Sequence, residues 1–147
     1  MKKAFTMIEL IFVIIMLGIL TAIAIPKLSA TRDDAENVKV FATFRNGSNE
    51  IITYALTKGR VESNFSVMSS SFNDLESSGI AVMQPYKAVI ESGNVNNCVT
   101  LEINSTTLND FAISYGNPNG DDSCEALQKM LKKVNYNIKI RGAGIAF

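Results

Sequence analysis

Residues 5–25 read FTMIELIFVIIMLGILTAIAI, an apolar run that contains a single charged side chain, Glu9. With a rise of about 1.5 Å per residue, an α-helix over this run would be about 32 Å long, which is enough to cross a bilayer. An acid costs about 2.5–3.5 kcal/mol at the centre of a membrane and less near its edge. The run therefore predicts a transmembrane helix in which the charge of Glu9 serves a purpose.

The flanks of this run predict its orientation and its continuation. Lys2 and Lys3 precede it, which favours a cytoplasmic amino terminus and an exported carboxy-terminal domain. Pro26 follows it, and we expect the helix to kink or loosen there because proline lacks an amide hydrogen and crowds the preceding turn. Beyond Pro26 apolar residues recur at spacings of three and four, which predicts an amphipathic helix over residues 26–59: Leu28, Ala35, Val38, Phe41, Ala42, Ile52, Ala55 and Leu56.

Asn46-Gly47 is a weak point of this helix, because glycine costs about 1 kcal/mol inside a helix and Asn-Gly favours turns. We predict that the helix continues through it under tertiary support and ends at Gly59. The alternative is a helix that ends near Arg45, with a second one that begins at Ser48.

The short basic segment at residues 1–4, the acid Glu9 and the proline Pro26 have the spacing of a known signature. They resemble the amino terminus of the type IV pilin and type II secretion pseudopilin superfamily. In that family a prepilin peptidase of the inner membrane removes a short basic leader before a Phe-Thr-(Leu/Met)-Ile-Glu-Leu start. The resemblance implies that residues 1–4 are a leader, that the cut falls between Ala4 and Phe5, and that Phe5 is then N-methylated. Ala4 departs from the glycine that the family prefers before the cut. The resemblance also implies that Glu9 pairs with the Phe5 amine of a neighbouring subunit and sets the register of assembly.

Two other interpretations of the same segment stay open. One is a secretory signal peptide cut after Ala22-Ile23-Ala24, although the apolar run is longer than usual for such a peptide and contains an acid. The other is an ordinary single-span anchor, in which Glu9 only reaches back to the membrane surface.

Residues 60–147 predict a small exported domain. A serine-rich connection over 60–80, with one helical turn around Phe72–Glu76, leads to strands at 86–91 and 98–103 and to a third strand on Phe111, Ile113 and Tyr115. Asp122 and Glu125 have the spacing of a capping box, and they open a helix whose apolar stripe is Leu127, Met130, Leu131 and Val134. Tyr136, Ile138 and Ile140 alternate as a last strand. The expected fold class is α+β, a long amino-terminal helix packed on a small antiparallel sheet with a short carboxy-terminal helix.

Cys98 and Cys124 are the two cysteines of the chain. In an exported domain such a pair predicts a disulfide, which the loop-closure estimate values at about 3–4 kcal/mol for this separation. The alternative is two buried free thiols. Many pilins also close their carboxy-terminal region with a disulfide, so the resemblance favours the bridge.

The composition offers little for catalysis, and we expect no enzyme activity, no catalytic residue, no cofactor and no bound metal. The chain has no His, the commonest general base and metal ligand. Oxygen-bearing residues alternate in a loop as they do in calcium sites, but a turn followed by a helix cap explains them better: Asn117, Asn119, Asp121 and Asp122. A basic side of the last helix fits a solvent face with an i,i+4 pair between Glu125 and Lys129 better than a binding site: Lys129, Lys132 and Lys133.

The function that the resemblance implies is structural. The chain is expected in the bacterial inner membrane as a single-pass protein with a periplasmic domain, and then in a pilus or pseudopilus of a type II secretion, type IV pilus or DNA-uptake machine. Its expected partners are copies of itself or related pilins, the prepilin peptidase, the assembly platform and the lipid bilayer. Two alternatives remain, a minor tip pilin that binds DNA or a surface, and an anchored exported domain with no filament role.

Overall fold

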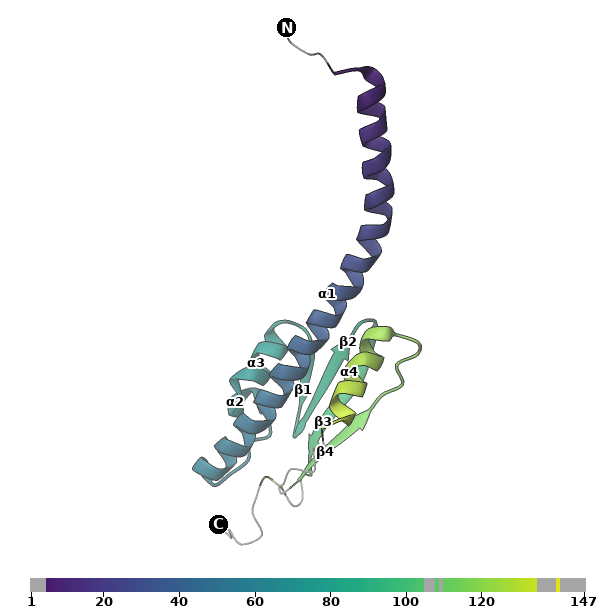
Figure 1. The fold of residues 1–147 in the computed structure, drawn as a ribbon. Coiled ribbons are helices and arrows are strands. Elements are labelled where there is room, and N and C mark those ends of the chain that lie inside the picture. The colour runs from purple at the N-terminus through teal and green to yellow at the C-terminus, as the bar shows by residue number, and fades with distance from the viewer. Residues whose placement is uncertain (1–4, 105–107, 109, 135–139, 141–147) are drawn as a thin grey trace. The chain divides into compact units, whose positions relative to one another are not determined.

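The computed structural model describes residues 5–104, 108, 110–134 and 140, and their contacts divide the chain into two units. The amino-terminal unit is Met1–Ala35 and the carboxy-terminal unit is Glu36–Phe147. Helix α1 (Met7–Lys58) has residues in both, and all other elements belong to the carboxy-terminal unit (Figure 1). The fold class is α+β, as predicted from the sequence.

The amino-terminal unit is helical from Met7 onward, and none of its described side chains is buried. Residues 7–25 are all exposed, including large apolar side chains such as Ile8 and Phe12. Within the part of the chain that the structure describes, Met7–Ile25 is the one helix long and apolar enough to cross a membrane, with a mean hydropathy of 2.8. The helix continues through residue 26, so Pro26 does not end it. The predicted kink at Pro26 stays a prediction.

In the carboxy-terminal unit α1 runs without a break through Asn46-Gly47 and ends at Lys58, which confirms the predicted continuous helix. Gly59 follows with a φ of 70° and donates its N–H to the carbonyl of Ala55, as a helix-ending glycine does. Gly47 is tolerated for a tertiary reason. A Cβ at this position would lie 2.6 Å from the ring of Phe72, so only glycine lets that ring pack against the helix.

Two short helices replace the predicted connecting region with one helical turn. They are α2 (Phe65–Met68) and α3 (Ser70–Ser77). The rings of Phe44, Phe65 and Phe72 pack edge to face, with centroid distances of 5.8 Å for Phe44–Phe72 and 5.6 Å for Phe65–Phe72. These aromatic contacts hold both helices against α1. The region is therefore part of the core as well as a connection.

The sheet has four antiparallel strands in the order β1-β2-β3-β4. Their bounds are Ala81–Gln84, Lys87–Ser92, Val95–Ile103 and Phe111–Tyr115. Strand β1 was not predicted, because its first three residues are all apolar and show no alternation between apolar and polar residues. Tyr86, predicted to open a strand, lies in the turn before β2 with a φ of 59°. Its N–H donates to the carbonyl of Ser63 at 2.7 Å, which accounts for this turn conformation.

Alternating residues of the sheet face one hydrophobic core, which also contains side chains of all four helices. The register brings Ile90 opposite Val99, and Leu101 opposite both Ala88 and Ile113. On the second face Val82, Glu102 and Ala112 are exposed, whereas Thr100 is buried. The half of α1 that lies in this unit contributes Val40, Phe44, Ile51 and Ala55 to the core, as an amphipathic helix should.

Helix α4 (Asp122–Lys132) contacts β2 and β3. Its cap is Asp121, one residue before the predicted Asp122, because the Asp121 side chain accepts a hydrogen bond from the N–H of Cys124. Of the predicted stripe, Leu127 and Leu131 are buried, while Met130 and Val134 are half-buried. The predicted last strand on Tyr136, Ile138 and Ile140 lies outside the described residues except for Ile140, which is buried in the core.

Candidate functional site

The start of α1 holds the residues that the sequence singles out for assembly. The carbonyl of Thr6 accepts hydrogen bonds from the N–H groups of Glu9 and Leu10, at 3.1 and 3.3 Å. The Thr6 hydroxyl donates to the Glu9 carboxylate at 3.4 Å. Glu9 is exposed in the first turn, where the helix dipole favours an acid. No ion pair to Glu9 is present among the residues that the structure describes.

Phe5 is exposed over 77% of its surface and lies just before the helix. Ala4, on the other side of the predicted cut, lies outside the described residues. Phe5 and Glu9 therefore both lie at the amino-terminal end of an exposed apolar helix. Their predicted pairing is between two chains, and it stays a prediction.

A second cluster, which sequence reasoning missed, joins α1 to the start of α3 through Glu50. The Glu50 carboxylate accepts hydrogen bonds from the hydroxyl groups of Ser69 at 2.7 Å, Ser71 at 3.0 Å and Ser70 at 3.3 Å. It also accepts one from the backbone N–H of Ser71 at 3.0 Å. Burial opposes the charge of Glu50, but these hydrogen bonds outweigh it and lower its pKa below the usual value.

The sequence held a usable signal for this cluster. Three consecutive hydroxyl residues, Ser69, Ser70 and Ser71, precede the apolar residues of a short helix, which is the composition of a helix start. The sequence analysis placed them only in a serine-rich connection over residues 60–80. In the structure Ser69 is buried and caps α3 by accepting a hydrogen bond from the N–H of Phe72. What the cluster does is structural: it fastens α3 to α1.

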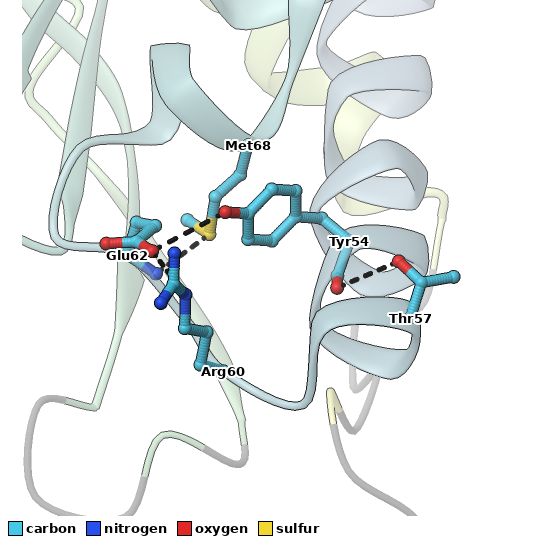
Figure 2. A network of polar contacts seen from close by, with 5 residues as sticks. All are labelled: Tyr54, Thr57, Arg60, Glu62 and Met68. Carbon is cyan, nitrogen blue, oxygen red and sulfur yellow. Dashed lines mark hydrogen bonds and ion pairs between the residues drawn. The ribbon is translucent and has the colours of Figure 1, made fainter.

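A polar network fastens the segment that follows α1 (Figure 2). Arg60 forms an ion pair with Glu62 at 2.7 Å, and the hydroxyl of Tyr54 donates to the same carboxylate oxygen at 3.4 Å. The N–H of Glu62 donates to the thioether sulfur of Met68 at 3.2 Å. The loop is thereby held to both α1 and α2, with its charged groups at the surface.

The predicted disulfide between Cys98 and Cys124 is present, with 5.6 Å between the two Cα atoms. It links β3 to the first turn of α4. Gln128, which is buried, adds a second link by donating to the carbonyls of Cys98 at 2.9 Å and Gly116 at 2.8 Å. These contacts hold α4 against the sheet.

Asp121 is fully used as a structural acceptor. One carboxylate oxygen accepts from the N–H of Asn94 at 3.0 Å and the other from the N–H of Cys124 at 2.9 Å. The N–H of Asn94, then that of Cys124, lower the pKa of Asp121. Gly93 leaves room for this carboxylate, since a Cβ there would lie 2.2 Å from it. Among the described residues, no three His, Cys, Asp or Glu side chains are grouped so that they could hold a metal ion.

The three lysines of α4 do not form one free basic surface. Lys129 pairs with Glu125 at 2.8 Å, which confirms the predicted i,i+4 pair, and its hydrogen bond lowers the pKa of Glu125. The ammonium of Lys132 lies 4.8 Å from the centre of the Tyr115 ring, in a cation–π contact. Lys133 is exposed at the carboxy-terminal cap of the helix.

Comparison with known proteins adds no name to this arrangement. No protein-family model, no curated protein and no solved structure matches the chain. The resemblance to pilins is thus carried by the sequence itself, through Phe5, Glu9 and Pro26.

Proposed function

We propose that this chain is a pilin-like structural subunit, which is processed at the bacterial inner membrane and polymerised into a pilus or pseudopilus. The observation that carries the proposal is an apolar helix, Met7–Ile25, whose side chains are exposed throughout and whose only charge is Glu9. Glu9 follows by four residues the position that would become the new amino terminus, Phe5.

The exposed apolar helix must be shielded from water, and a pilin can shield it in two ways. Lipid covers it while the subunit waits in the membrane with its carboxy-terminal unit exported. Packing against the same helices of other subunits covers it in a filament, where helix–helix contacts replace lipid contacts. Both coverings suit a helix that is apolar on all sides, whereas the core helix of a soluble domain would be buried within its own chain.

Glu9 makes the helix–helix packing in the filament specific. The Thr6 hydroxyl is a neutral donor, so it does not supply the positive charge that would balance Glu9 in an apolar surrounding. Cleavage before Phe5 creates an ammonium group, and this ammonium on a neighbouring subunit neutralises Glu9. A buried ion pair adds little net stability, but either partner left alone is costly, so the pair selects one register. Cleavage therefore acts as a switch for assembly, and the energy for extraction comes from the assembly ATPase and its platform.

Mass spectrometry of the chain produced together with a prepilin peptidase tests the proposal. The mature protein should begin at Phe5 and carry a methyl group on its amino terminus. Ala4→Gly should be cut at least as fast, because it restores the residue that the family prefers. Ala24→Leu, which destroys the competing signal-peptide site, should be processed unchanged.

The other two interpretations predict different products. A mature chain that begins at Ile25 would show a secretory signal peptide, and a chain that keeps Met1 would show a plain anchor. Either product would overturn the proposed function.

A further inference from the structure

Asparagine followed by glycine occurs twice in this chain, at Asn46-Gly47 and at Asn119-Gly120. Such a pair is open to a spontaneous reaction, in which the backbone nitrogen of the glycine attacks the side-chain amide carbon of the asparagine. Glycine has no side chain to hinder this approach. The two pairs have the same sequence, but the fold places them in opposite environments.

Asn46-Gly47 lies in the interior of α1, where the fold opposes the reaction. Gly47 is buried, and its N–H belongs to the hydrogen-bonded ladder of the helix. The ring of Phe72 fills the space beside it, since a Cβ on Gly47 would lie 2.6 Å from that ring. Ser48 is buried as well, and its hydroxyl donates to the carbonyl of Phe44 at 2.9 Å. The reacting atoms can therefore meet only if this part of the helix unfolds.

Asn119-Gly120 lies in the loop between β4 and α4, and both residues are exposed (Figure 1). They are the central residues of a β-turn, which the N–H of Asp121 closes by donating to the carbonyl of Pro118 at 2.8 Å. Their φ angles are 53° and 81°, as in a type I′ turn. A Cβ on Gly120 would meet no atom within 4 Å, so nothing in the described structure packs against the turn there.

The reaction at this turn needs only a local opening. Asn119 must rotate about its ψ angle for its amide carbon to reach the nitrogen of Gly120, and this rotation breaks the hydrogen bond between Asp121 and Pro118. Within the described part of the chain the N–H of Gly120 donates no hydrogen bond. Asn119 also leaves a left-handed conformation, which is unfavourable for a residue with a side chain. The opening therefore costs less than unfolding α1 beside Phe72.

We propose that Asn119 is a site of spontaneous deamidation and isoaspartate formation, and that the fold protects Asn46 from the same reaction. The Gly120 nitrogen loses its proton and bonds to the Asn119 amide carbon, whose own nitrogen leaves as ammonia. Water then opens the resulting succinimide at one of its two carbonyls. One opening gives aspartate, and the other gives isoaspartate, in which the main chain runs through the side-chain carbon. The inference concerns the carboxy-terminal unit alone and does not depend on the proposed function.

The isoaspartate has a structural consequence at the cap of α4. Asp121 accepts hydrogen bonds from the N–H groups of Cys124 at 2.9 Å and Asn94 at 3.0 Å. An extra main-chain carbon before Gly120 displaces Asp121 from the turn that positions it. The N–H of Cys124 should then exchange with solvent about two- to thirtyfold faster, the factor that corresponds to the loss of a helix cap. The disulfide keeps α4 attached to β3, so the change stays local.

Incubation of the detergent-solubilised full chain in mildly alkaline buffer tests the site. Pepsin digestion in acid stops the reaction, and mass spectrometry with an isoaspartate-specific methyltransferase then measures both asparagines. In the folded chain Asn119 should react about a hundredfold faster than Asn46, which corresponds to a difference of about 2.8 kcal/mol in local opening. In urea, with the disulfide reduced, the two should react at similar rates, because only the shared Asn-Gly sequence then matters.

Asn119→Gln is the matched control, because the longer glutamine side chain forms the corresponding six-membered ring far more slowly. It should abolish the isoaspartate around residue 119. The deamidated natural chain carries one more negative charge and is separated by anion exchange. Hydrogen exchange should then be faster in its peptide that contains Cys124 and unchanged in the peptide that contains Leu101, in the interior of β3.

Each of the following results would contradict the inference. Equal rates at Asn46 and Asn119 in the folded chain would show that the fold does not distinguish them. Reaction at Asn119 in urea alone would show that the turn is too rigid to react. Isoaspartate that persists in Asn119→Gln would belong to another residue. Unchanged exchange at Cys124 in the isoaspartate form would overturn the effect on the cap of α4.

Discussion

The two units of this chain use apolar side chains in opposite ways. In the amino-terminal unit, Phe12 is 63% exposed and the helix around it buries nothing. In the carboxy-terminal unit, Phe72 is fully buried and meets two other phenylalanine rings. Hydrophobicity alone therefore does not make a core. In the proposed function the first unit is completed by lipid or by other chains, whereas the second unit has a core of its own.

The contrast is clearest within α1, which has residues in both units. Up to Ile25 its side chains are apolar on every side, and after Glu36 the apolar residues that are buried lie on one face, with Val40, Phe44 and Ile51 inside. A uniform apolar surface suits a uniform apolar solvent, and a stripe suits a single packed partner. Along this one helix the pattern thus changes from apolar on all sides to apolar on one face.

The largest expected effect concerns the charge in the first unit. Glu9→Leu should lower incorporation into filaments by about two to four orders of magnitude, since it leaves the Phe5 ammonium unpaired and an unpaired buried charge costs about 3–5 kcal/mol. Membrane insertion, leader cleavage and the folding of the carboxy-terminal unit should be unaffected. Recovery of the tagged subunit in sheared filaments measures the effect, with Glu36→Leu as a control on an exposed acid outside the apolar run. Normal assembly of Glu9→Leu would refute the pairing with Phe5.

Two matched phenylalanine substitutions test the contrast itself. Phe72→Ala should lower the free energy of unfolding of the carboxy-terminal unit by about 3–5 kcal/mol, because it leaves a cavity beside Gly47 and two aromatic rings. Phe12→Ala should leave that free energy unchanged, because Phe12 is 63% exposed and does not belong to the core of the carboxy-terminal unit. Urea unfolding of the detergent-solubilised chain, followed by near-ultraviolet circular dichroism, compares them. Equal losses would mean that the units are not energetically separate.

The disulfide should stabilise the second unit alone. The double substitution Cys98→Ala with Cys124→Ala should lower its free energy of unfolding by about 3–4 kcal/mol, as the loop-closure estimate gives for this separation. Thiol labelling of the unreduced natural chain should find no free thiol. Membrane insertion of residues 5–25 should be the same with or without the bridge. Labelling of both cysteines in native material would contradict the bond.

The smallest expected effect is a pH dependence at Glu50. Its pKa is lower in the folded chain than in the unfolded one, so its stabilisation is present above the unfolded value and is lost as the pH falls through the folded value. Glu50→Gln should therefore cost about 1–2 kcal/mol at pH 7, since the carboxylate is only partly buried. The difference between the two proteins should shrink below about pH 4. A gap that stays constant down to pH 2.5 would show that the hydroxyl contacts act without the charge.

Residues with local causes were predictable from the sequence. The apolar helix was found because the composition of residues 5–25 alone matches a bilayer, and the end of α1 was found because Gly59 is free to adopt a positive φ. Strands whose sequence alternates between apolar and polar residues, such as Val99–Ile103, were also predicted, because this alternation is itself a local pattern. The disulfide between Cys98 and Cys124 was predicted because a pair of cysteines in an exported domain favours a bridge.

What escaped prediction depends on partners distant in the sequence. Gly47 reads as a helix weakness until Phe72 fills the space that its missing side chain leaves. Glu50 reads as an exposed polar residue until Ser69, Ser70 and Ser71 arrive at it from nineteen or more residues away. The physical reason is that a pattern along the chain records which environment each side chain prefers. Which other side chains supply that environment is decided only when the chain has folded.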